Sequence, residues 1–281
     1  MITVAQTSVK TFLSKSKIPG FDYVINPYVG CPHKCIYCYA EYMRKFSGHE
    51  EEWGNFLDVR HCDVPLKPAQ LFHRHVLLSS VTDPYNPYEQ KYQLTRSLLK
   101  QLQQCQAYVR ILTKSALVVR DCDLLKQLPQ CQVTFSFSSA DENFRQLIEP
   151  ETSSVEEKIT ALHTLHEQGI STHVMIAPIM PGLTDWKEII SRTRAYVNSY
   201  NFDSLNMRPA YQRKVLRFIE QHYPHVLPLY TDIYLHENNA YWENLATEIR
   251  AYTDAENIPA EIYFPHPPRH PHKEENLLFE L

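Results

Sequence analysis

The sequence predicts an α/β protein in which parallel strands alternate with helices and curl into an open barrel. Six short runs of apolar or alternating residues have strand length, and most are followed by a stretch with apolar residues at helical spacing. Strands separated by helices of 8 to 16 residues form parallel βαβ units. Because parallel crossovers are right-handed, six such units curl in one direction. The predicted strands are residues 23–25, 75–79, 108–112, 132–138, 173–179 and 204–208.

The helices between these strands are predicted from apolar periodicity and from capping residues. Leu94, Leu98 and Leu102 recur on one face of a helix that follows the second strand. Ser153 and Glu156 have the spacing of a capping box, and Gly169 suits the end of the helix that they begin. The predicted helices are residues 41–46, 91–105, 121–128, 153–168 and 185–199.

The last quarter of the chain departs from this alternation. Two helices and a short strand are predicted there, at residues 212–223, 240–255 and 261–264. The proline-rich residues 265–272 cannot be helical. Their three histidines could bind a metal, but we favour an extended segment that lies on the barrel. We therefore expect an N-terminal arm at residues 1–22, a partial barrel at 23–210, and a helical and extended C-terminal extension packed on it at 211–281.

Composition places the chain among cytoplasmic globular proteins. Its 281 residues, 43% of them hydrophobic, suit one domain of barrel size. No apolar run approaches the length of a membrane span, and the first residues do not resemble a signal peptide. Seven cysteines without a disulfide-like framework fit a reducing compartment. A net charge of −4 gives no overall attraction to nucleic acid, although it permits a local basic cleft.

Three cysteines, Cys31, Cys35 and Cys38, occur at C-x3-C-x2-C spacing in one loop after the first predicted strand. Thiolates are soft ligands that hold iron–sulfur clusters or zinc. A [4Fe–4S] cluster has four irons, so three cysteines leave one iron free to bind a molecule other than protein. The alternatives are a zinc site that uses His33 or a distant ligand, and surface cysteines that bind nothing. His33 lies within the loop and can hardly complete a tetrahedron with its own neighbours, so we favour the cluster.

This motif, with the aromatic Tyr37 before its third cysteine, resembles the signature of the radical S-adenosylmethionine (SAM) superfamily. Other segments resemble the spore-photoproduct-lyase-like branch of that superfamily, namely residues 15–23, 26–31, 38–40, 82–87, 111–115 and 177–185. The resemblance implies a partial (β/α)6 TIM-type barrel and a [4Fe–4S] cluster on Cys31, Cys35 and Cys38. It also implies that SAM binds the open iron and that a reductant such as flavodoxin or ferredoxin supplies electrons.

Polar residues follow the strands at the edge where such a barrel carries its chemistry, the C-terminal strand ends. The cysteine loop follows the first strand, and each later strand contributes at least one candidate. The candidates on this rim are Ser80, Thr82, Lys114, Ser136, Ser138, Pro178 and Arg208. Because they share one rim, we expect them to form one site.

The chemistry of SAM suggests a role for each candidate. The resemblance implies that Lys114 binds the carboxylate of SAM and that Tyr37 lies beside the adenine. The hydroxyl groups on the rim suit ribose and carboxylate oxygens, although serine is also common in turns. Pro178 would provide an apolar wall for the adenine. Arg208 would bind SAM or an anionic substrate, or would pair with a carboxylate of the rim.

The chain differs from spore photoproduct lyases proper at the end of the second strand, where those enzymes carry a hydrogen-donating cysteine. Residues 79–83 contain no cysteine, which argues against thymine-dimer repair. Cys62 is the candidate for a radical quencher, whereas Cys105, Cys122 and Cys131 are expected to be structural thiols. No second C-x2-C pair is present, so we expect no auxiliary cluster.

The sequence therefore predicts a radical SAM enzyme that abstracts hydrogen from a substrate it does not identify. Family analogy favours nucleic acid or a nucleobase, and a small metabolite or a peptide is the alternative. A hypothesis of another class is a non-catalytic iron–sulfur or zinc-binding module. If the substrate is a nucleic acid, Trp53 could stack on a base. We favour the interpretation that Trp53 makes an apolar contact that covers a loop.

Overall fold

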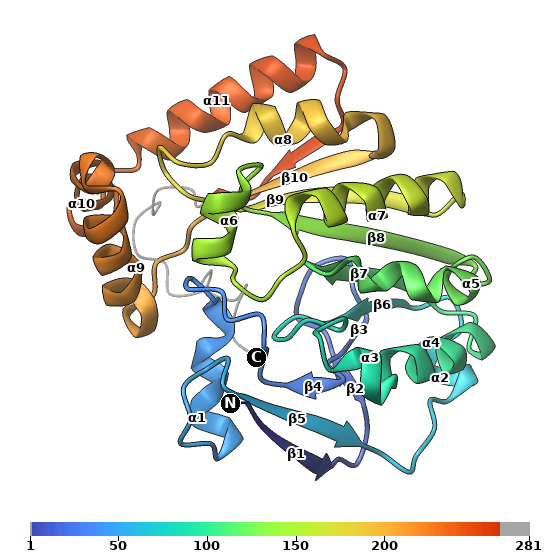
Figure 1. Cartoon of the computed structure of the whole chain (residues 1–281). Coiled ribbons are helices and arrows are strands. Elements are labelled where there is room, and N and C mark those ends of the chain that lie inside the picture. Colours follow the sequence, from blue (N-terminus) through green and yellow to red (C-terminus); the bar gives the residue numbers. More distant parts are fainter. Residues whose placement is uncertain (1, 265–281) are drawn as a thin grey trace.

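The computed structural model describes residues 2–264, and its centre is a curved sheet that forms a partial TIM-type barrel (Figure 1). The strand order is β11-β10-β9-β8-β7-β6-β3-β2, and all neighbours are parallel except β2 and β3. The strands are β2 (Leu13–Lys15), β3 (Tyr23–Ile25), β6 (His75–Leu78), β7 (Tyr108–Thr113), β8 (Gln130–Phe137), β9 (Ser171–Ile179), β10 (Ser199–Ser204) and β11 (Ala260–Ile262). The sequence thus predicted the fold class and six of these strands, β3, β6, β7, β8, β9 and, with a shift of one or two residues, β11.

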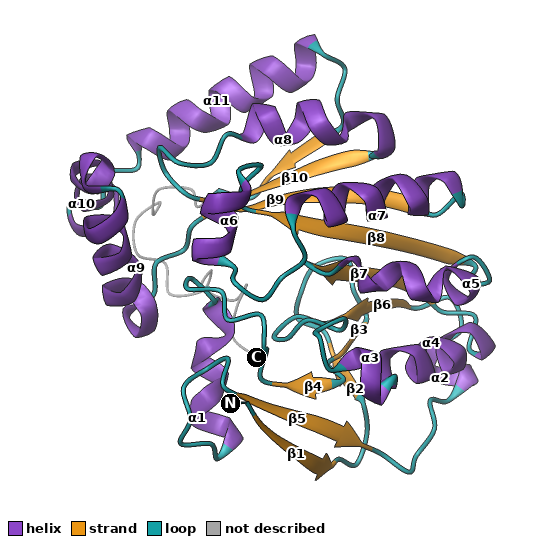
Figure 2. Cartoon of the chain, viewed as in Figure 1, coloured by secondary structure: helices purple, strands orange, loops and turns teal. Residues whose placement is uncertain are grey.

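Helices cover the outer side of this sheet (Figure 2). The apolar stripes of α4, α7, α8 and α11 share one buried cluster with the strands, which includes Leu98, Leu162, Ile190 and Ile249. Each of these four side chains is completely buried, which is worth about 1.5–3 kcal/mol per residue. The helices up to residue 196 are η1 (Tyr39–Met43), α1 (Arg44–Ser47), α2 (Pro68–Leu71), α3 (Glu89–Tyr92), α4 (Leu94–Gln104), η2 (Ala116–Asp121), α5 (Cys122–Leu125), α6 (Glu142–Ile148), α7 (Val155–Glu167), α8 (Trp186–Thr193) and η3 (Arg194–Tyr196).

A second, three-stranded sheet lies beside the first strand of the barrel and was not predicted. Strand β5 (Phe56–His61) pairs in parallel with β1 (Thr3–Ser8) and antiparallel with β4 (Tyr28–Val29). Its own small core contains Tyr28, Leu57 and Val59. The chain reaches the cysteine loop directly from β4, so this sheet helps to position the loop.

The C-terminal part supplies both helices and one more strand of the barrel. Helix α9 (Pro209–His222), η4 (Pro224–Val226) and α10 (Leu227–Leu235) lie at one end of the barrel, and α11 (Ala240–Ala255) returns along the sheet (Figure 1). Strand β11 then pairs in parallel with β10. The predicted helices at 212–223 and 240–255 are present, whereas α10 was not predicted. The histidines of the segment 265–272 lie outside the described residues.

The sixth strand was predicted at residues 204–208, but the observed strand begins five residues earlier, at Ser199, and ends at Ser204. Strand β10 covers Ser199–Ser204, and it alternates between buried Tyr200 and Phe202 and more exposed polar residues. The predicted strand covered residues 204–208, but the side chains of Leu205 and Met207 pack with α9 and α10 instead. Arg208 consequently caps α9 and does not end a strand.

The capping box of α7 was wrong by one residue. Ser154 and Glu157 form it, and Ser153 instead accepts a hydrogen bond from the Ala116 amide at 2.9 Å. The predicted helix at 185–199 is also shorter, because α8 ends at Thr193 and β10 begins soon after. Among residues 2–264, no helix is both long and apolar enough to span a bilayer.

Candidate active site

The cysteine loop begins at a glycine that no other residue can replace without strain. Gly30 has φ +86°, and a Cβ atom there would lie 2.4 Å from the carbonyl oxygen of Phe56. Within the loop, the amide of Lys34 donates to Cys31 and the amide of Cys38 donates to Cys35. These two turns wrap the backbone around the three thiols.

Neighbouring loops hold the cysteine loop on two sides. The amide of Ile36 donates to the carbonyl of Ile148 at 3.0 Å, and the amide of Glu151 donates to the carbonyl of His33 at 3.3 Å. On the other side, the Thr82 hydroxyl donates to the carbonyl of Gly30 at 2.6 Å. Hydrogen bonds from the loops that follow β6 and α6 therefore fix the position of the cysteine loop.

The donor set of the loop fits an iron–sulfur cluster. Burial raises the pKa of the thiols of Cys31, Cys35 and Cys38, so three thiolates at this place need a cationic centre. Cys31 and Cys38 pack beside Trp53, whereas Cys35 packs with the apolar group that contains Met180. The thiols thus lie against two different apolar surfaces, as ligands of a multi-iron core would.

His33 is committed to another partner. Its side chain is buried, and Nδ1 lies 3.4 Å from Oδ2 of Asp83. Burial lowers the pKa of His33, although the Asp83 carboxylate acts in the opposite direction. Among residues 2–264, no three histidine, cysteine, aspartate or glutamate side chains surround a point that would hold a single metal ion.

Asp83 connects three of the loops on the rim. Its carboxylate accepts hydrogen bonds from the Thr113 hydroxyl at 2.7 Å and from the Lys114 amide at 2.8 Å. It also accepts from the amide of Tyr85 at 2.8 Å and faces His33. The carboxylate therefore fixes the start of the Lys114 loop relative to the cysteine loop.

Lys114 lies in the centre of a polar network that contains two of the predicted serines. Its ammonium donates to Ser136 Oγ at 2.7 Å and lies 2.9 Å from Oε1 of Glu149. Ser138 donates to the same Oε1 at 2.7 Å, and the Tyr37 hydroxyl also contacts both Ser138 and Glu149. The structure thus brings Tyr37, Lys114, Ser136 and Ser138 together around the carboxylate of Glu149. The sequence analysis expected these four residues on one rim but did not single out Glu149.

Glu149 escaped the sequence analysis because nothing in its neighbourhood resembles a motif. It ends α6 just before Pro150, a position that reads as a simple helix terminus. Two lysines hold the pKa of Glu149 well below its usual range, although burial alone would raise it. A fully buried carboxylate with several charged partners is a signal that only the tertiary structure provides.

The remaining candidates occupy different parts of the rim. The Ser80 amide donates to Oδ1 of Asn26 at 2.9 Å, and the Ser80 carbonyl accepts from Tyr39, so this turn is fixed to the cysteine loop. Pro178 lies near the end of β9, after Ala177, whose carbonyl accepts from Ser136 and Ser138.

Two candidates lie away from this group. Arg208 lies at the start of α9, within electrostatic range of Tyr42. Cys62 follows β5, whose first residue Phe56 touches Gly30, so it lies roughly 20 Å further along the strand at about 3.3 Å per residue. The structure does not bring Cys62 to the cysteine loop.

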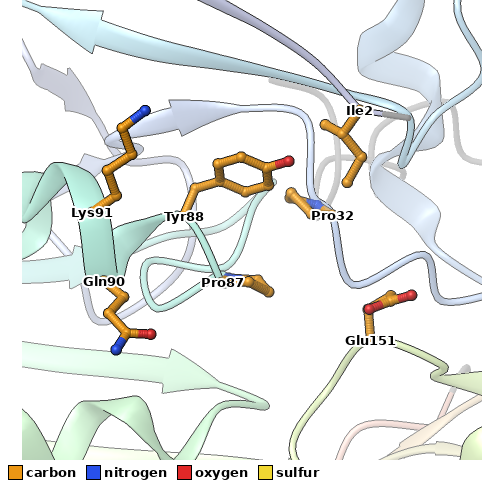
Figure 3. A pocket seen from close by; sticks show the side chains of 7 residues that line it. All are labelled: Ile2, Pro32, Pro87, Tyr88, Gln90, Lys91 and Glu151. Atoms are coloured by element: carbon orange, nitrogen blue, oxygen red, sulfur yellow. The ribbon is translucent and has the colours of Figure 1, made fainter.

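Two further features were not predicted. Asp203 near the end of β10 accepts a hydrogen bond from the adjacent Ser204 amide, and burial raises its pKa to about 7. A cavity of about 500 Å³ opens on the outer side of the cysteine loop at Pro32 and Glu151 (Figure 3). Its other lining residues are Ile2, Pro87, Tyr88, Gln90 and Lys91.

Comparisons with known proteins agree with this arrangement. The Radical SAM superfamily matches residues 25–192. An uncharacterised protein of Methanocaldococcus jannaschii is 37% identical over 223 residues, which are 79% of this chain and 85% of that protein. A radical SAM Nα-GlyT isomerase of Pseudomonas phage M6 is 25% identical over 188 residues, which cover 62% of this chain and 37% of the phage protein.

The fold is similar to that of a solved structure, spore photoproduct lyase complexed with dinucleoside spore photoproduct. The two share a TM-score of 0.64 at 19% identity, over 94% of this chain and 82% of the lyase chain. The superfamily match covers more than half of the chain and includes the three-cysteine loop at the C-terminal edge of the barrel. The chain therefore belongs to the radical SAM superfamily.

Proposed function

We propose that this protein is an enzyme that reductively cleaves SAM at a [4Fe–4S] cluster and abstracts hydrogen from an organic substrate. Cys31, Cys35 and Cys38 would hold the cluster, which supplies the electron that splits SAM into methionine and a 5′-deoxyadenosyl radical. The observation that carries the proposal is the loop of three thiols next to Lys114, a lysine whose side chain is only 15% exposed. A non-catalytic module would bind no SAM and would tolerate Lys114→Ala.

The residues around the loop would each hold one part of SAM. Lys114 would bind the carboxylate of SAM. Glu149 and Ser136 hold its ammonium beside the cysteine loop, and its side chain, 15% exposed, is accessible to a ligand. Ser136 and Ser138 would accept or donate at the polar oxygens, with Ser80 and Thr82 on the opposite side. The Tyr37 ring and Pro178 would contact the adenine. Arg208, at the start of α9, would contact SAM or an anionic substrate.

We further propose that the protein works in a reducing cytosol, where flavodoxin or ferredoxin can deliver the electron. The seven cysteines without a disulfide framework support this location. The superfamily as a whole depends on an external reductant, so the choice between these two carriers is a matter for experiment.

For the substrate we propose nucleic acid or a nucleobase. Helix α9 packs on η1, directly after the third cysteine, and its exposed residues include Arg213, Lys214 and Arg217. Cations beside a catalytic cleft attract a phosphate backbone. The similarity of the fold to a lyase that is complexed with a dinucleoside photoproduct points in the same direction.

The substrate proposal is tested by the stimulation of 5′-deoxyadenosine formation. Single-stranded and duplex DNA, RNA, a peptide mixture and a metabolite extract are each added to the reconstituted enzyme with SAM and dithionite. We expect stimulation by a nucleic acid and transfer of deuterium from a deuterated oligonucleotide into 5′-deoxyadenosine. Stimulation by peptides or metabolites alone would establish the alternative substrate class.

Charge reversal on α9 separates a specific surface from general charge attraction. We expect the double substitution Arg213→Glu and Arg217→Glu to weaken stimulation by nucleic acid. The matched control reverses two exposed lysines, Lys100→Glu on α4 and Lys126→Glu directly after α5, and should retain stimulation. Helices α4 and α5 lie on the opposite side of the molecule from α9 (Figure 1). Equal losses in both double variants would contradict a role for α9.

A further inference from the structure

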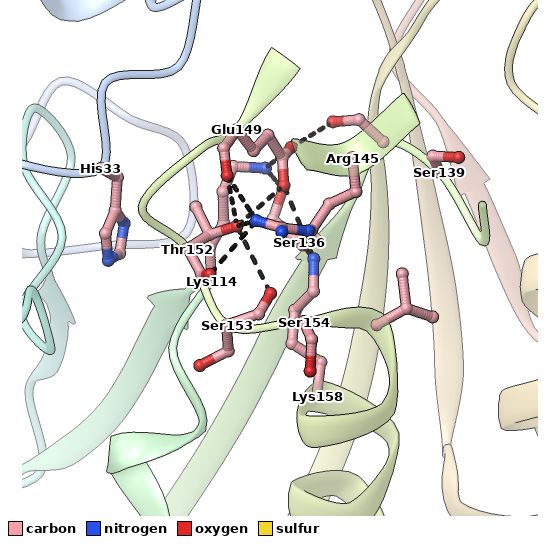
Figure 4. A network of polar contacts seen from close by, with 12 residues as sticks. His33, Lys114, Ser136, Ser139, Arg145, Glu149, Thr152, Ser153, Ser154 and Lys158 are labelled. Carbon is pink, nitrogen blue, oxygen red and sulfur yellow. Dashed lines mark hydrogen bonds and ion pairs between the residues drawn. The ribbon is translucent and has the colours of Figure 1, made fainter. Parts of the chain in front are cut away.

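One buried carboxylate is shared by two lysines behind the cysteine loop (Figure 4). Oε1 of Glu149 lies 2.9 Å from Nζ of Lys114, and Oε2 lies 3.5 Å from Nζ of Lys158. Oε1 also accepts hydrogen bonds from Ser138 and Tyr37. A single ion pair would already neutralise this carboxylate, so the second lysine needs an explanation.

The two lysines differ in their access to the site. The side chains of Glu149 and Lys158 are 0% exposed, whereas that of Lys114 is 15% exposed. Lys158 comes from α7 and lies over the ring of Phe137 at 4.5 Å, with its ammonium 3.5 Å from the carbonyl of Ser136. Lys158 is therefore enclosed, and Lys114 is the member of the pair that can turn toward a ligand.

Keeping Lys158 charged at this place is unfavourable. Burial lowers its pKa to about 8, even though Glu149 acts in the opposite direction. An apolar side chain of similar size would pack over Phe137 without this cost. The benefit must therefore arise in a state of the protein where Glu149 would otherwise stand alone.

That state is the complex with SAM. When Lys114 binds the carboxylate of SAM, it gives up at least part of its interaction with Glu149. A buried carboxylate that loses its partner is strongly destabilised. If Lys158 were absent, Glu149 would hold Lys114 back and compete with the ligand for the same ammonium.

We propose that Lys158 and Glu149 are positioning residues that release Lys114 to SAM. Glu149 holds Lys114 in place beside Tyr37 before the ligand arrives, and Lys158 keeps Glu149 neutralised after Lys114 has turned. This inference rests on the proposed function, because it takes Lys114 as the partner of SAM. It predicts that Lys158, which does not touch SAM, controls the affinity for SAM.

A double-mutant cycle tests the release, with the equilibrium dissociation constant of SAM on the reconstituted protein as readout. In Lys158→Met, Glu149 retains Lys114, so the constant should rise by about 10- to 100-fold, the effect of losing a charge-assisted hydrogen bond. In the double variant Glu149→Gln with Lys158→Met, no charge holds Lys114, so affinity should return toward the wild-type value. The glutamine retains an acceptor oxygen for Tyr37 and Ser138.

Several results would overturn the inference. One is a double variant that binds SAM as weakly as Lys158→Met, or more weakly, since a purely structural role predicts additive or worse losses. Another is unchanged affinity in Lys158→Met. Iron content and the electron paramagnetic resonance signal of the reduced cluster are measured in every variant to show that the cluster itself is intact.

A second variant tests the inference if Lys158→Met does not fold or does not take up the iron–sulfur cluster. Glu149→Gln alone should bind SAM at least as tightly as the wild type, because the glutamine oxygen can still hold Lys114 beside Tyr37 by a hydrogen bond but no longer opposes its turn toward SAM with a charge. Weaker binding in that variant would overturn the inference. Failure of the proposed function looks different, because the wild type would then bind no SAM, or Lys114→Met would leave the affinity unchanged.

Discussion

The indole Nε1 of Trp53 donates a hydrogen bond to Sγ of Cys38 at 3.2 Å. Trp53 is buried and packs edge-on against Phe56, the residue whose carbonyl touches Gly30. The indole therefore covers the third cysteine of the loop as an apolar contact and also supplies a donor to its sulfur. Donors to cluster sulfurs raise the reduction potential, because they stabilise the more negative reduced state.

Trp53→Phe should lower the reduction potential of the cluster without preventing its assembly. The loss of one neutral hydrogen bond, about 0.5–1.5 kcal/mol, corresponds to a negative shift of roughly 20–60 mV for one electron. Potentiometric titration followed by electron paramagnetic resonance measures the shift. Trp186→Phe, which removes an indole from the outer core beside Phe202, is the matched control and should not change the potential. A positive shift in Trp53→Phe would contradict the assignment.

Gly30→Ala should disturb both folding and cluster loading. The new Cβ would clash with a backbone oxygen and would stand in a left-handed conformation, which together cost roughly 2–4 kcal/mol. Gly48→Ala shares the positive φ but has no atom within 4 Å of the new Cβ, so it should cost only about 1 kcal/mol. Chemical denaturation and iron analysis compare the two. Equal stability of both variants would show that the contact with Phe56 is unimportant.

Protonation of His173 should lower the free energy of unfolding of the protein in mild acid. Its ring lies between the hydroxyls of Ser171 and Ser199, and burial, with help from Arg110, lowers its pKa to about 4. Because the unfolded chain binds the proton first, stability is complete above pH 6.5 and falls as the pH approaches 4. The loss should be roughly 1–2 kcal/mol, a value discounted for the partial exposure of the ring.

His173→Gln isolates this contribution. We expect the difference in unfolding free energy between the wild type and the variant to shrink between pH 7 and pH 5. His166→Gln, on the exposed side of α7, is measured in parallel as a control for the substitution itself. A constant difference for His173→Gln would show that this histidine has an ordinary pKa.

Local signals in the sequence account for the parts of the fold and site that were predicted. The strands at residues 75–78 and 108–113 are short segments rich in valine, leucine and isoleucine, a local signal that predicts strands. The cysteine loop is likewise a motif of eight consecutive residues. The rule that barrel chemistry occupies the C-terminal strand ends then brought Lys114, Ser136 and Ser138 to the same site.

The missed features depend on contacts between distant segments. Strand β10 carries Asn201 and Asp203 among its buried aromatics, so it lacks the apolar run that marked the other strands. Strand β5 pairs with β1, a segment far before it in the sequence, so its strand character depends on a distant contact. Glu149 acquires its charged partners only in the folded chain, from Lys114, which follows β7, and from Lys158 of α7.

The most direct test of the account combines metal analysis with SAM cleavage. The protein is reconstituted anaerobically, iron and sulfide are counted, SAM and dithionite are added, and 5′-deoxyadenosine is assayed by chromatography. Cys31→Ala, Cys35→Ala and Cys38→Ala are compared with Cys122→Ala, which lies outside the loop. We predict about four irons per chain and slow release of 5′-deoxyadenosine in the wild type and in Cys122→Ala, and loss of both in the three loop variants. Zinc in place of iron, or a cluster that never cleaves SAM, would contradict the account.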